Sequence, residues 1–68
     1  MTGSELIAKL RKFGFYEARQ KGSHARLKHP DGRCTTVPLH AGETISIGLL
    51  HKIIVRDCRL SMEEFRRV

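Results

Sequence analysis

The sequence predicts a small α+β fold in which two helices cover one face of a three-stranded antiparallel sheet. Two observations support this prediction. Apolar residues recur at helical spacing near the start of the chain and again after residue 46, whereas the stretch between them holds short strand-like runs, the clearest of which alternates polar and apolar residues. A sheet of this kind has one apolar face to hide, and two amphipathic helices suffice to cover it.

A helix is predicted over residues 3–13. Thr2-Gly3-Ser4-Glu5 has the spacing of a capping box, in which a hydroxyl and a carboxylate satisfy the first backbone amides. The apolar residues that follow recur at helical spacing: Leu6, Ile7, Leu10 and Phe13. Gly14 then favours a helix end, because glycine readily adopts the left-handed conformation that closes many helices.

Two strands are predicted next, over residues 15–21 and 24–29, with Gly22-Ser23 as the break or tight turn between them. In the second strand the side chains alternate, so that the row facing outward is cationic: His24, Arg26 and Lys28. The opposite row should face the other way, toward the core: Ala25, Leu27 and His29.

A third strand over residues 33–39 completes the predicted antiparallel meander. The turn before it, His29-Pro30-Asp31-Gly32, is favourable because its proline fixes φ, its aspartate can bond nearby backbone and its glycine tolerates the left-handed region. Pro38 suits an edge strand, since proline cannot donate a hydrogen bond to a sheet ladder.

The second helix is predicted to begin after Ser46, a capping residue. Its expected core face is apolar: Leu49, Leu50, Ile53 and Ile54. Arg56-Asp57-Cys58-Arg59 should end it, and Ser61-Met62-Glu63-Glu64 is a second capping box that opens a short turn able to dock Phe65. The element order, α-β-β-β-α with a short C-terminal helical turn, is that of a double-stranded-RNA-binding-domain-like α+β fold.

The length of 68 residues predicts one domain, residues 1–68, with a thin core, so any chemistry should occur on a surface or in a shallow groove. No apolar run approaches the roughly 18–20 residues of a membrane span, and no signal-peptide core is visible. We therefore expect a cytoplasmic protein that is a monomer when free and has no membrane partner. Cys34 and Cys58 lack a CxxC spacing and are expected to be reduced packing residues.

Positive charge is concentrated in one part of the chain. The formal charge is +6, and the segment from Lys9 to Arg33 holds eight Lys and Arg against only Glu17 and Asp31, whereas the remainder nearly balances. Such a field favours a polyanionic partner through phosphate contacts and counterion release. The sequence therefore favours nucleic acid, or an acidic protein that mimics it, over a merely solvated basic surface.

Histidine is the residue type best suited to chemistry in this chain. The four histidines show no metal-ligand spacing with one another or with acidic residues, so no metal or other cofactor is expected. RNA supplies its own nucleophile, the 2′-hydroxyl beside the scissile phosphate, and a neutral imidazole with an ordinary pKa of about 6.5 can remove that proton. Lysine and arginine can stabilise the added charge of the transition state. The pattern favours metal-independent RNA cleavage.

His24 is the best placed of the four histidines. It follows Gly22-Ser23, where a backbone without bulk lets a phosphate approach and the serine hydroxyl can donate a hydrogen bond. Cations lie close to it in the sequence: Lys21, Arg26 and Lys28. His29 is expected to be structural, and the two later histidines, His40 and His51, to be exposed polar residues. The residues alone also allow His24 to be an exposed strand residue without a function.

Three motifs in order resemble the HicA toxin family of bacterial type II toxin–antitoxin systems: Arg19-Gln20-Lys21-Gly22-Ser23-His24, His29-Pro30-Asp31-Gly32-Arg33 and Thr36-Val37-Pro38. Ser4-Glu5-Leu6-Ile7 and the segment from Ile47 to Ser61 are similar to the same family, so the resemblance spans almost the whole chain. It implies a double-stranded-RNA-binding-like fold, a metal-independent ribonuclease acting on mRNA, and catalysis by the histidine of the Gly-Ser-His motif, His24. It also implies a HicB-like antitoxin that blocks this histidine.

Three positions depart from the family pattern. Ile47 stands where a proline is frequent and Arg59 where a glycine is frequent, which should weaken the ends of the second helix by about 1 kcal/mol or less each. Ala25 stands where a second histidine or another polar residue is common, which leaves a one-histidine mechanism intact. No second histidine is clearly placed to protonate the leaving 5′-oxygen, which leaves that step to a lysine or water.

The sequence therefore predicts an mRNA interferase in which His24 is the general base. The expected RNA-binding residues are Lys21, Gly22, Ser23, Arg26 and Lys28. Two alternatives remain open. A non-catalytic RNA-binding module of the same fold would need the basic surface but not His24, and a protein-interaction domain would use the basic face to meet an acidic partner.

Overall fold

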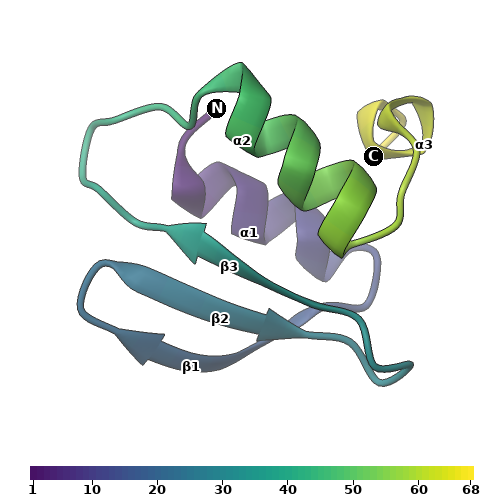
Figure 1. Cartoon of the computed structure of the whole chain (residues 1–68), viewed down its shortest axis with the longest axis horizontal. Helices are drawn as coiled ribbons and strands as arrows, with labels where there is room; N and C mark the ends of the chain where they lie inside the picture. The colour runs from purple at the N-terminus through teal and green to yellow at the C-terminus, as the bar shows by residue number, and fades with distance from the viewer.

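The computed structural model describes residues 1–68 and has two layers, a sheet and the helices that cover it. The elements in chain order are α1 (Gly3–Arg11), β1 (Tyr16–Lys21), β2 (His24–Lys28), β3 (Cys34–Pro38), α2 (Ile47–His51), η1 (Lys52–Asp57) and α3 (Met62–Arg66). Figure 1 shows α1 and the continuous helix of α2 and η1 on one side of the sheet, with α3 at one end of the molecule. This is the predicted α-β-β-β-α order, and it is compatible with a double-stranded-RNA-binding-domain-like arrangement.

The sheet has the strand order β1-β2-β3, and both neighbouring pairs are antiparallel, as the meander predicted. Every strand boundary lies within one residue of its predicted position. In β2 the buried Ala25 and Leu27 alternate with the exposed His24, Arg26 and Lys28, which confirms the predicted alternation. The proline at the end of β3 lies in an edge strand, where its missing amide hydrogen leaves no gap in the ladder.

The first helix is capped as predicted but ends earlier than expected. The Thr2 hydroxyl accepts a hydrogen bond from the Glu5 amide at 3.2 Å, and the Glu5 carboxylate accepts one from the Thr2 amide at 2.8 Å. The bond from the Thr2 amide holds the pKa of Glu5 below its ordinary value. The helix ends at Arg11 rather than at residue 13, because the chain tightens into a turn that closes at Gly14, whose φ is +96°.

The core lies between the helices and the covered face of the sheet. Its buried apolar side chains come from both layers: Leu6, Ile7, Leu10, Phe15, Ala25, Leu27, Val37, Ile53, Ile54, Cys58, Leu60 and Phe65. The buried polar side chain is Thr35, whose hydroxyl donates to the Asp57 carboxylate at 2.8 Å and so ties β3 to the end of η1. By contrast, β1 is exposed along its whole length.

The second helix departs from its predicted core face. Ser46 caps it as expected, with its hydroxyl accepting a hydrogen bond from the Leu49 amide at 3.3 Å. However, α2 has no buried residue and Leu49 is 37% exposed, so the prediction that Leu49 belongs to the core is wrong. The helix widens into a π-helix in η1, where Ile53 and Ile54 are buried. Leu49 lies in the first turn of α2, before the helix widens, and no side chain of α2 is buried.

The end of η1 carries backbone strain at Arg59. Arg59 has a φ of +55° and is the only non-glycine residue with a positive φ. The Leu60 amide then donates to the Ile54 carbonyl at 3.0 Å, which closes the helix. A side chain in this left-handed conformation costs roughly 1–2 kcal/mol. The strained residue is therefore Arg59, which stands where the family pattern frequently has a glycine.

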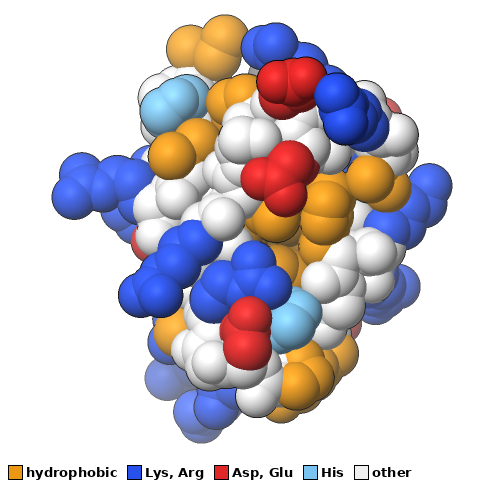
Figure 2. Space-filling view, turned by 90° about the vertical axis from the view of Figure 1, so that its right-hand side faces the viewer, with side chains coloured by type: hydrophobic (Ala, Val, Ile, Leu, Met, Phe, Trp, Pro, Cys, Tyr) orange, Lys and Arg blue, Asp and Glu red, His pale blue; other side chains and the backbone are white.

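The C-terminal helix docks on the rest of the molecule through one aromatic side chain. The predicted capping box is present, with bonds of 3.0 Å from the Glu64 amide to the Ser61 hydroxyl and from the Ser61 amide to the Glu64 carboxylate. Phe65 is 3% exposed and stacks on Phe13, with ring centroids 6.4 Å apart. Figure 2, which faces this end of the molecule, shows apolar side chains flanked by many Lys and Arg side chains and few acidic ones.

Candidate RNA-binding groove and active site

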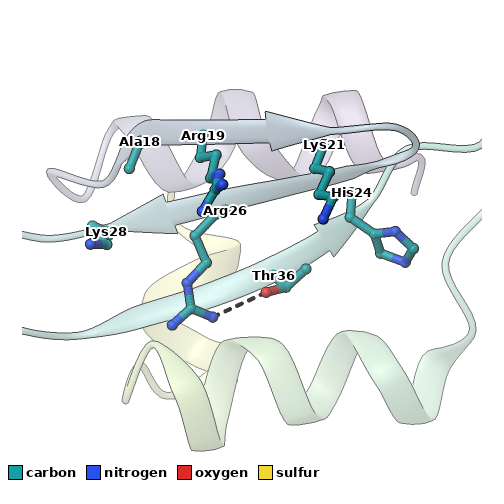
Figure 3. Close-up of a pocket in the computed structure, with 7 residues that line it drawn as sticks. All are labelled: Ala18, Arg19, Lys21, His24, Arg26, Lys28 and Thr36. Carbon is teal, nitrogen blue, oxygen red and sulfur yellow. Dashed lines mark hydrogen bonds between the residues drawn. The ribbon is translucent and has the colours of Figure 1, made fainter.

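The uncovered face of the sheet carries a shallow groove of about 430 Å³. Its lining residues come from all three strands: Ala18, Arg19, Lys21, His24, Arg26, Lys28 and Thr36. Figure 3 shows their side chains on the face of the sheet turned away from the helices. The volume is within the range of about 300–1,000 Å³ typical of ligand sites, but only one lining residue is apolar. The groove therefore suits a charged ligand.

A bulge in β1 directs basic side chains into the groove. The register between β1 and β2 shifts between Glu17 and Arg19, so that Ala18 is an extra residue in its strand. Beyond the bulge, Arg19 lies opposite Arg26, and Lys21 lies opposite the first residue of β2. Because a shift of one residue exchanges the two faces of a strand, an unbulged β1 would point Arg19 and Lys21 toward the helix side.

The basic side chains of the groove lack acidic partners. None of them takes part in an ion pair: Arg19, Lys21, Arg26 and Lys28. Glu17 does not compensate them, because it lies opposite the buried Leu27 and lines a hollow on the α1 side of the sheet. Like charges directly opposite each other, as in the Arg19–Arg26 pair, destabilise a sheet. The groove thus holds uncompensated positive charge that a polyanion would neutralise.

Contacts with β3 fix the direction of Arg26. Its guanidinium donates to Thr36 Oγ1 and to Cys34 Sγ, each at 3.1 Å. Figure 3 shows the side chain extended across β3 to Thr36. A guanidinium has five N–H donors, so donors remain for a phosphate after these two contacts. Arg26 is therefore a planar donor group whose orientation is set before any ligand binds.

His24 begins β2 directly after a two-residue hairpin loop. Gly22 is the first residue of that loop and has a φ of +58°, a conformation that favours glycine. A Cβ at residue 22 would meet no protein atom within 4 Å, so the loop backbone is open on that side. The His24 side chain is exposed and forms no hydrogen bond within the protein. Figure 3 shows its ring directed past the end of β3, with Lys21 reaching across β2 beside it.

A second histidine, His40, lies beside His24. The two ring centroids are 6.3 Å apart and the ring planes are at 81°. The contact follows from the sheet pairing, because His24 lies opposite Pro38 and the Leu39 amide donates to the Ser23 carbonyl. His40 is exposed, as predicted, but sequence reasoning did not place it at this site.

The other two histidines lie outside the groove. His29 is structural, as expected: its Nε2 is 3.0 Å from the Phe13 carbonyl oxygen, and its Nδ1 lies 3.1 Å from the Asp31 amide nitrogen and 2.9 Å from the Asp31 carboxylate. Its ring also packs edge-on against Phe15, with centroids 5.0 Å apart. His51 is exposed on α2, as predicted, and does not line the groove.

Four of the predicted site residues come together in the groove: Lys21, His24, Arg26 and Lys28. Gly22 and Ser23 form the adjoining turn but do not line it. Sequence reasoning did not single out three residues of this region: Arg19, Thr36 and His40. The charge of Arg19 was visible in the sequence, but its direction depends on the bulge. His40 had no local signal, because its position depends on the pairing of β2 with β3.

The remaining polar groups show no further cluster. No three or more His, Cys, Asp or Glu side chains gather as a metal site would require. Both cysteines are free, and burial raises the pKa of the Cys58 thiol to about 12, so this thiol stays protonated near neutral pH.

None of the helices has the length and apolar character that a membrane crossing needs.

One comparison with known proteins gives a match. A family model described as the HicA toxin of bacterial toxin–antitoxin systems matches residues 3–60. The matched range includes α1, the whole sheet with its groove, and both α2 and η1. No curated protein matches the chain.

Proposed function

Because the chain belongs to the HicA toxin family of bacterial toxin–antitoxin systems, we propose that it is a metal-independent endoribonuclease that cleaves mRNA with His24 as general base. One observation carries the proposal. His24 is exposed at the end of a groove that contains four basic side chains and no acidic one. This arrangement offers binding sites for consecutive phosphates and, next to them, a group able to accept a proton near pH 7.

The chemistry requires little from the protein, because RNA contains the nucleophile. A neutral His24 ring takes the proton of a 2′-hydroxyl, and the oxygen attacks the neighbouring phosphorus. The bond from phosphorus to the 5′-oxygen then breaks, which leaves a 2′,3′-cyclic phosphate on one fragment and a 5′-hydroxyl on the other. An open groove is sufficient for this reaction, because no separate water molecule has to be positioned as the nucleophile.

The basic side chains have distinct tasks in this proposal. Lys21 lies opposite His24 and is placed to stabilise the negative charge that grows on the phosphate oxygens during attack. Arg26 is oriented by its contacts with β3 and offers planar donors to the neighbouring phosphate. Lys28 on β2 and Arg19 on β1 extend the positive surface across the sheet. The open backbone of Gly22 and the hydroxyl of Ser23 shape the approach at the turn.

An antitoxin would control the same surface. A toxin of a toxin–antitoxin system implies an antitoxin partner, and we propose that this partner is HicB-like and covers His24 and the groove. The uncompensated charge of the groove favours an acidic contact surface on that partner, because opposite charges speed association and fix the orientation of docking. Toxin and antitoxin would meet in the cytoplasm, where mRNA is found.

Cleavage of RNA by the purified protein in the presence of excess EDTA tests this function. The parent should cleave single-stranded mRNA and leave DNA of the same sequence intact, and His24→Ala should slow cleavage about 10²–10⁴-fold. His51→Ala is the matched control, because His51 is an exposed histidine outside the groove. Growth arrest on expression should disappear with His24→Ala and persist with His51→Ala.

The result would contradict the proposal if His24→Ala cleaved RNA at the parent rate. Binding of RNA without cleavage by the parent would favour a non-catalytic RNA-binding module of the same fold, for which the basic groove would be sufficient. Tight binding of an acidic protein with no affinity for RNA would instead indicate a protein-interaction domain.

A further inference from the structure

His40 is held next to His24 by the backbone rather than by its own side chain. The Leu39 amide donates to the Ser23 carbonyl, so the chain that leaves β3 passes the start of β2. The Glu43 amide then donates to the His40 carbonyl at 3.0 Å, which closes a turn after it. These bonds fix the position of residue 40 and leave its ring exposed, without a hydrogen bond to any protein group.

The cleavage reaction needs a proton donor as well as a base. One proton leaves the 2′-hydroxyl, and the departing 5′-oxygen must gain one, since an unprotonated alkoxide is a poor leaving group. The basic side chains of the groove are weak donors, because lysine and arginine ordinarily hold their protons up to a pKa of about 10.4 and above 12. An imidazolium is the donor best matched to a neutral working pH.

We propose that His40 is the general acid of the reaction, an inference that rests on the proposed RNA cleavage by His24. His24 accepts the proton of the 2′-hydroxyl while the bond from that oxygen to phosphorus forms. The bond from phosphorus to the 5′-oxygen breaks, and the protonated His40 ring gives its proton to that oxygen. Proton exchange with water then returns both rings to their starting states, so atoms and charge balance over one turnover.

The geometry of the two rings suits this division of roles. The two rings form no hydrogen bond with each other, and their centroids lie 6.3 Å apart at 81°, which places both imidazoles within reach of a single phosphodiester. Both rings are exposed, so one phosphodiester can be reached from both sides. His29 cannot serve in this way, because both of its ring nitrogens already have partners in the protein.

Two substrates that differ in one atom test the inference. The first is an RNA oligonucleotide with a single natural linkage open to cleavage. The second carries sulfur in place of the 5′-bridging oxygen at that linkage. A thiol has a pKa of about 8.5, against about 15.7 for water, so a sulfur leaving group departs without a proton donor. A general acid is therefore needed for the first substrate but not for the second.

We expect His40→Ala to slow single-turnover cleavage of the natural linkage about 10²–10⁴-fold and to cleave the sulfur linkage within about threefold of the parent rate. His24→Ala should be slow on both substrates, because the base is needed in either case. His51→Ala should match the parent on both. His40→Gln, which keeps a polar side chain of similar size without a transferable proton, should behave like His40→Ala.

Either of two results would overturn the role of His40. One is cleavage of the natural linkage by His40→Ala at the parent rate, and the other is an equal loss on both substrates. Failure of the proposed function has a different signature, namely a parent that cleaves neither substrate or a His24→Ala variant as fast as the parent. Because the His40 ring is exposed and unbonded, the thermal unfolding midpoint of both His40 variants should equal that of the parent.

Discussion

The two ends of β2 each carry a histidine beside a glycine-containing turn, but their surroundings are opposite. At the end that begins with His24, the ring is exposed and unbonded, and the neighbouring Lys21 has no acidic partner. At the other end, both nitrogens of His29 are engaged, and Arg33 pairs with Asp31 at 2.8 Å. The same residue types therefore stabilise the fold at one end and remain available to a ligand at the other.

This difference separates two uses of a charged side chain. The Arg33 guanidinium also donates to the Cys58 carbonyl at 2.6 Å and lies over the Phe15 ring at 5.1 Å, so it joins the β2–β3 turn to the end of η1. No comparable contact restrains Lys21 or Lys28. Substitutions at the His29 end should therefore change the free energy of unfolding, whereas substitutions at the His24 end should change RNA binding and cleavage.

A large loss of stability is expected from Arg33→Ala. It removes a charge-assisted bond to a backbone carbonyl at a partly buried site, which should lower the free energy of unfolding by about 2 kcal/mol. In a domain of this size the thermal midpoint should fall by roughly 10 °C. Thermal unfolding followed by circular dichroism measures this directly, and an unchanged midpoint would show that the turn is not anchored through Arg33.

Lys21→Ala is the matched substitution at the open end. It should change the free energy of unfolding by less than about 0.5 kcal/mol, because Lys21 makes no ion pair or hydrogen bond. RNA binding should weaken, and the slope of the logarithm of the binding constant against the logarithm of salt concentration should fall by about 1. Binding isotherms at several salt concentrations test this. A slope equal to that of the parent would place Lys21 outside the RNA contact.

Acid should reduce the stability that Asp31 gives to the turn between β2 and β3. A bond from the Arg33 amide holds the pKa of Asp31 below its ordinary value of 3.8, with further help from the Arg33 and His29 charges. A lowered folded-state pKa means that ionised Asp31 contributes stability above about pH 4, and this stability is lost as pH falls through the folded-state value. Asp31→Asn should therefore be less stable than the parent at pH 7, with a difference that shrinks below pH 4. Urea unfolding at a series of pH values measures it; a constant difference would contradict the coupling.

A small gain in stability is expected from Arg59→Gly. Glycine relieves the left-handed strain at φ +55°, partly offset by the greater freedom of glycine in the unfolded chain. The net gain should be about 0.5–1 kcal/mol, with no change in RNA cleavage, because residue 59 lies outside the groove. A lower unfolding midpoint in this variant would show that the Arg59 side chain stabilises the helix end.

The fold was predictable where its signals are local. Capping boxes at Thr2 and Ser61, the alternation of β2 and the turn glycines depend on residues close in sequence, and each lies where the pattern placed it. The π-helix was not predictable, because no spacing rule marks where a helix widens. Leu49 was assigned to the core because its spacing from Ile53 fits an α-helix, but it lies in the first turn of α2, where no side chain is buried.

The part of the candidate site that lies on β2 was also predictable from the sequence. The alternation of β2 placed His24, Arg26 and Lys28 on one outward row, and the structure has them there. The contributions of Arg19 and His40 arise from the bulge in β1 and from the pairing of β2 with β3. Both features depend on how two strands pair, and the sequence of one strand alone does not predict that pairing.

The most direct test of the account compares His24→Ala with His29→Ala in two assays, single-turnover RNA cleavage with EDTA and thermal unfolding. His24→Ala should lose cleavage about 10²–10⁴-fold and keep the parent midpoint. His29→Ala should lower the free energy of unfolding by about 1–3 kcal/mol, because it leaves the Phe13 carbonyl without its partner, while the folded fraction cleaves at the parent rate. If His24→Ala retained cleavage, or His29→Ala lost cleavage while keeping its stability, the assignment of the two ends of β2 would be contradicted.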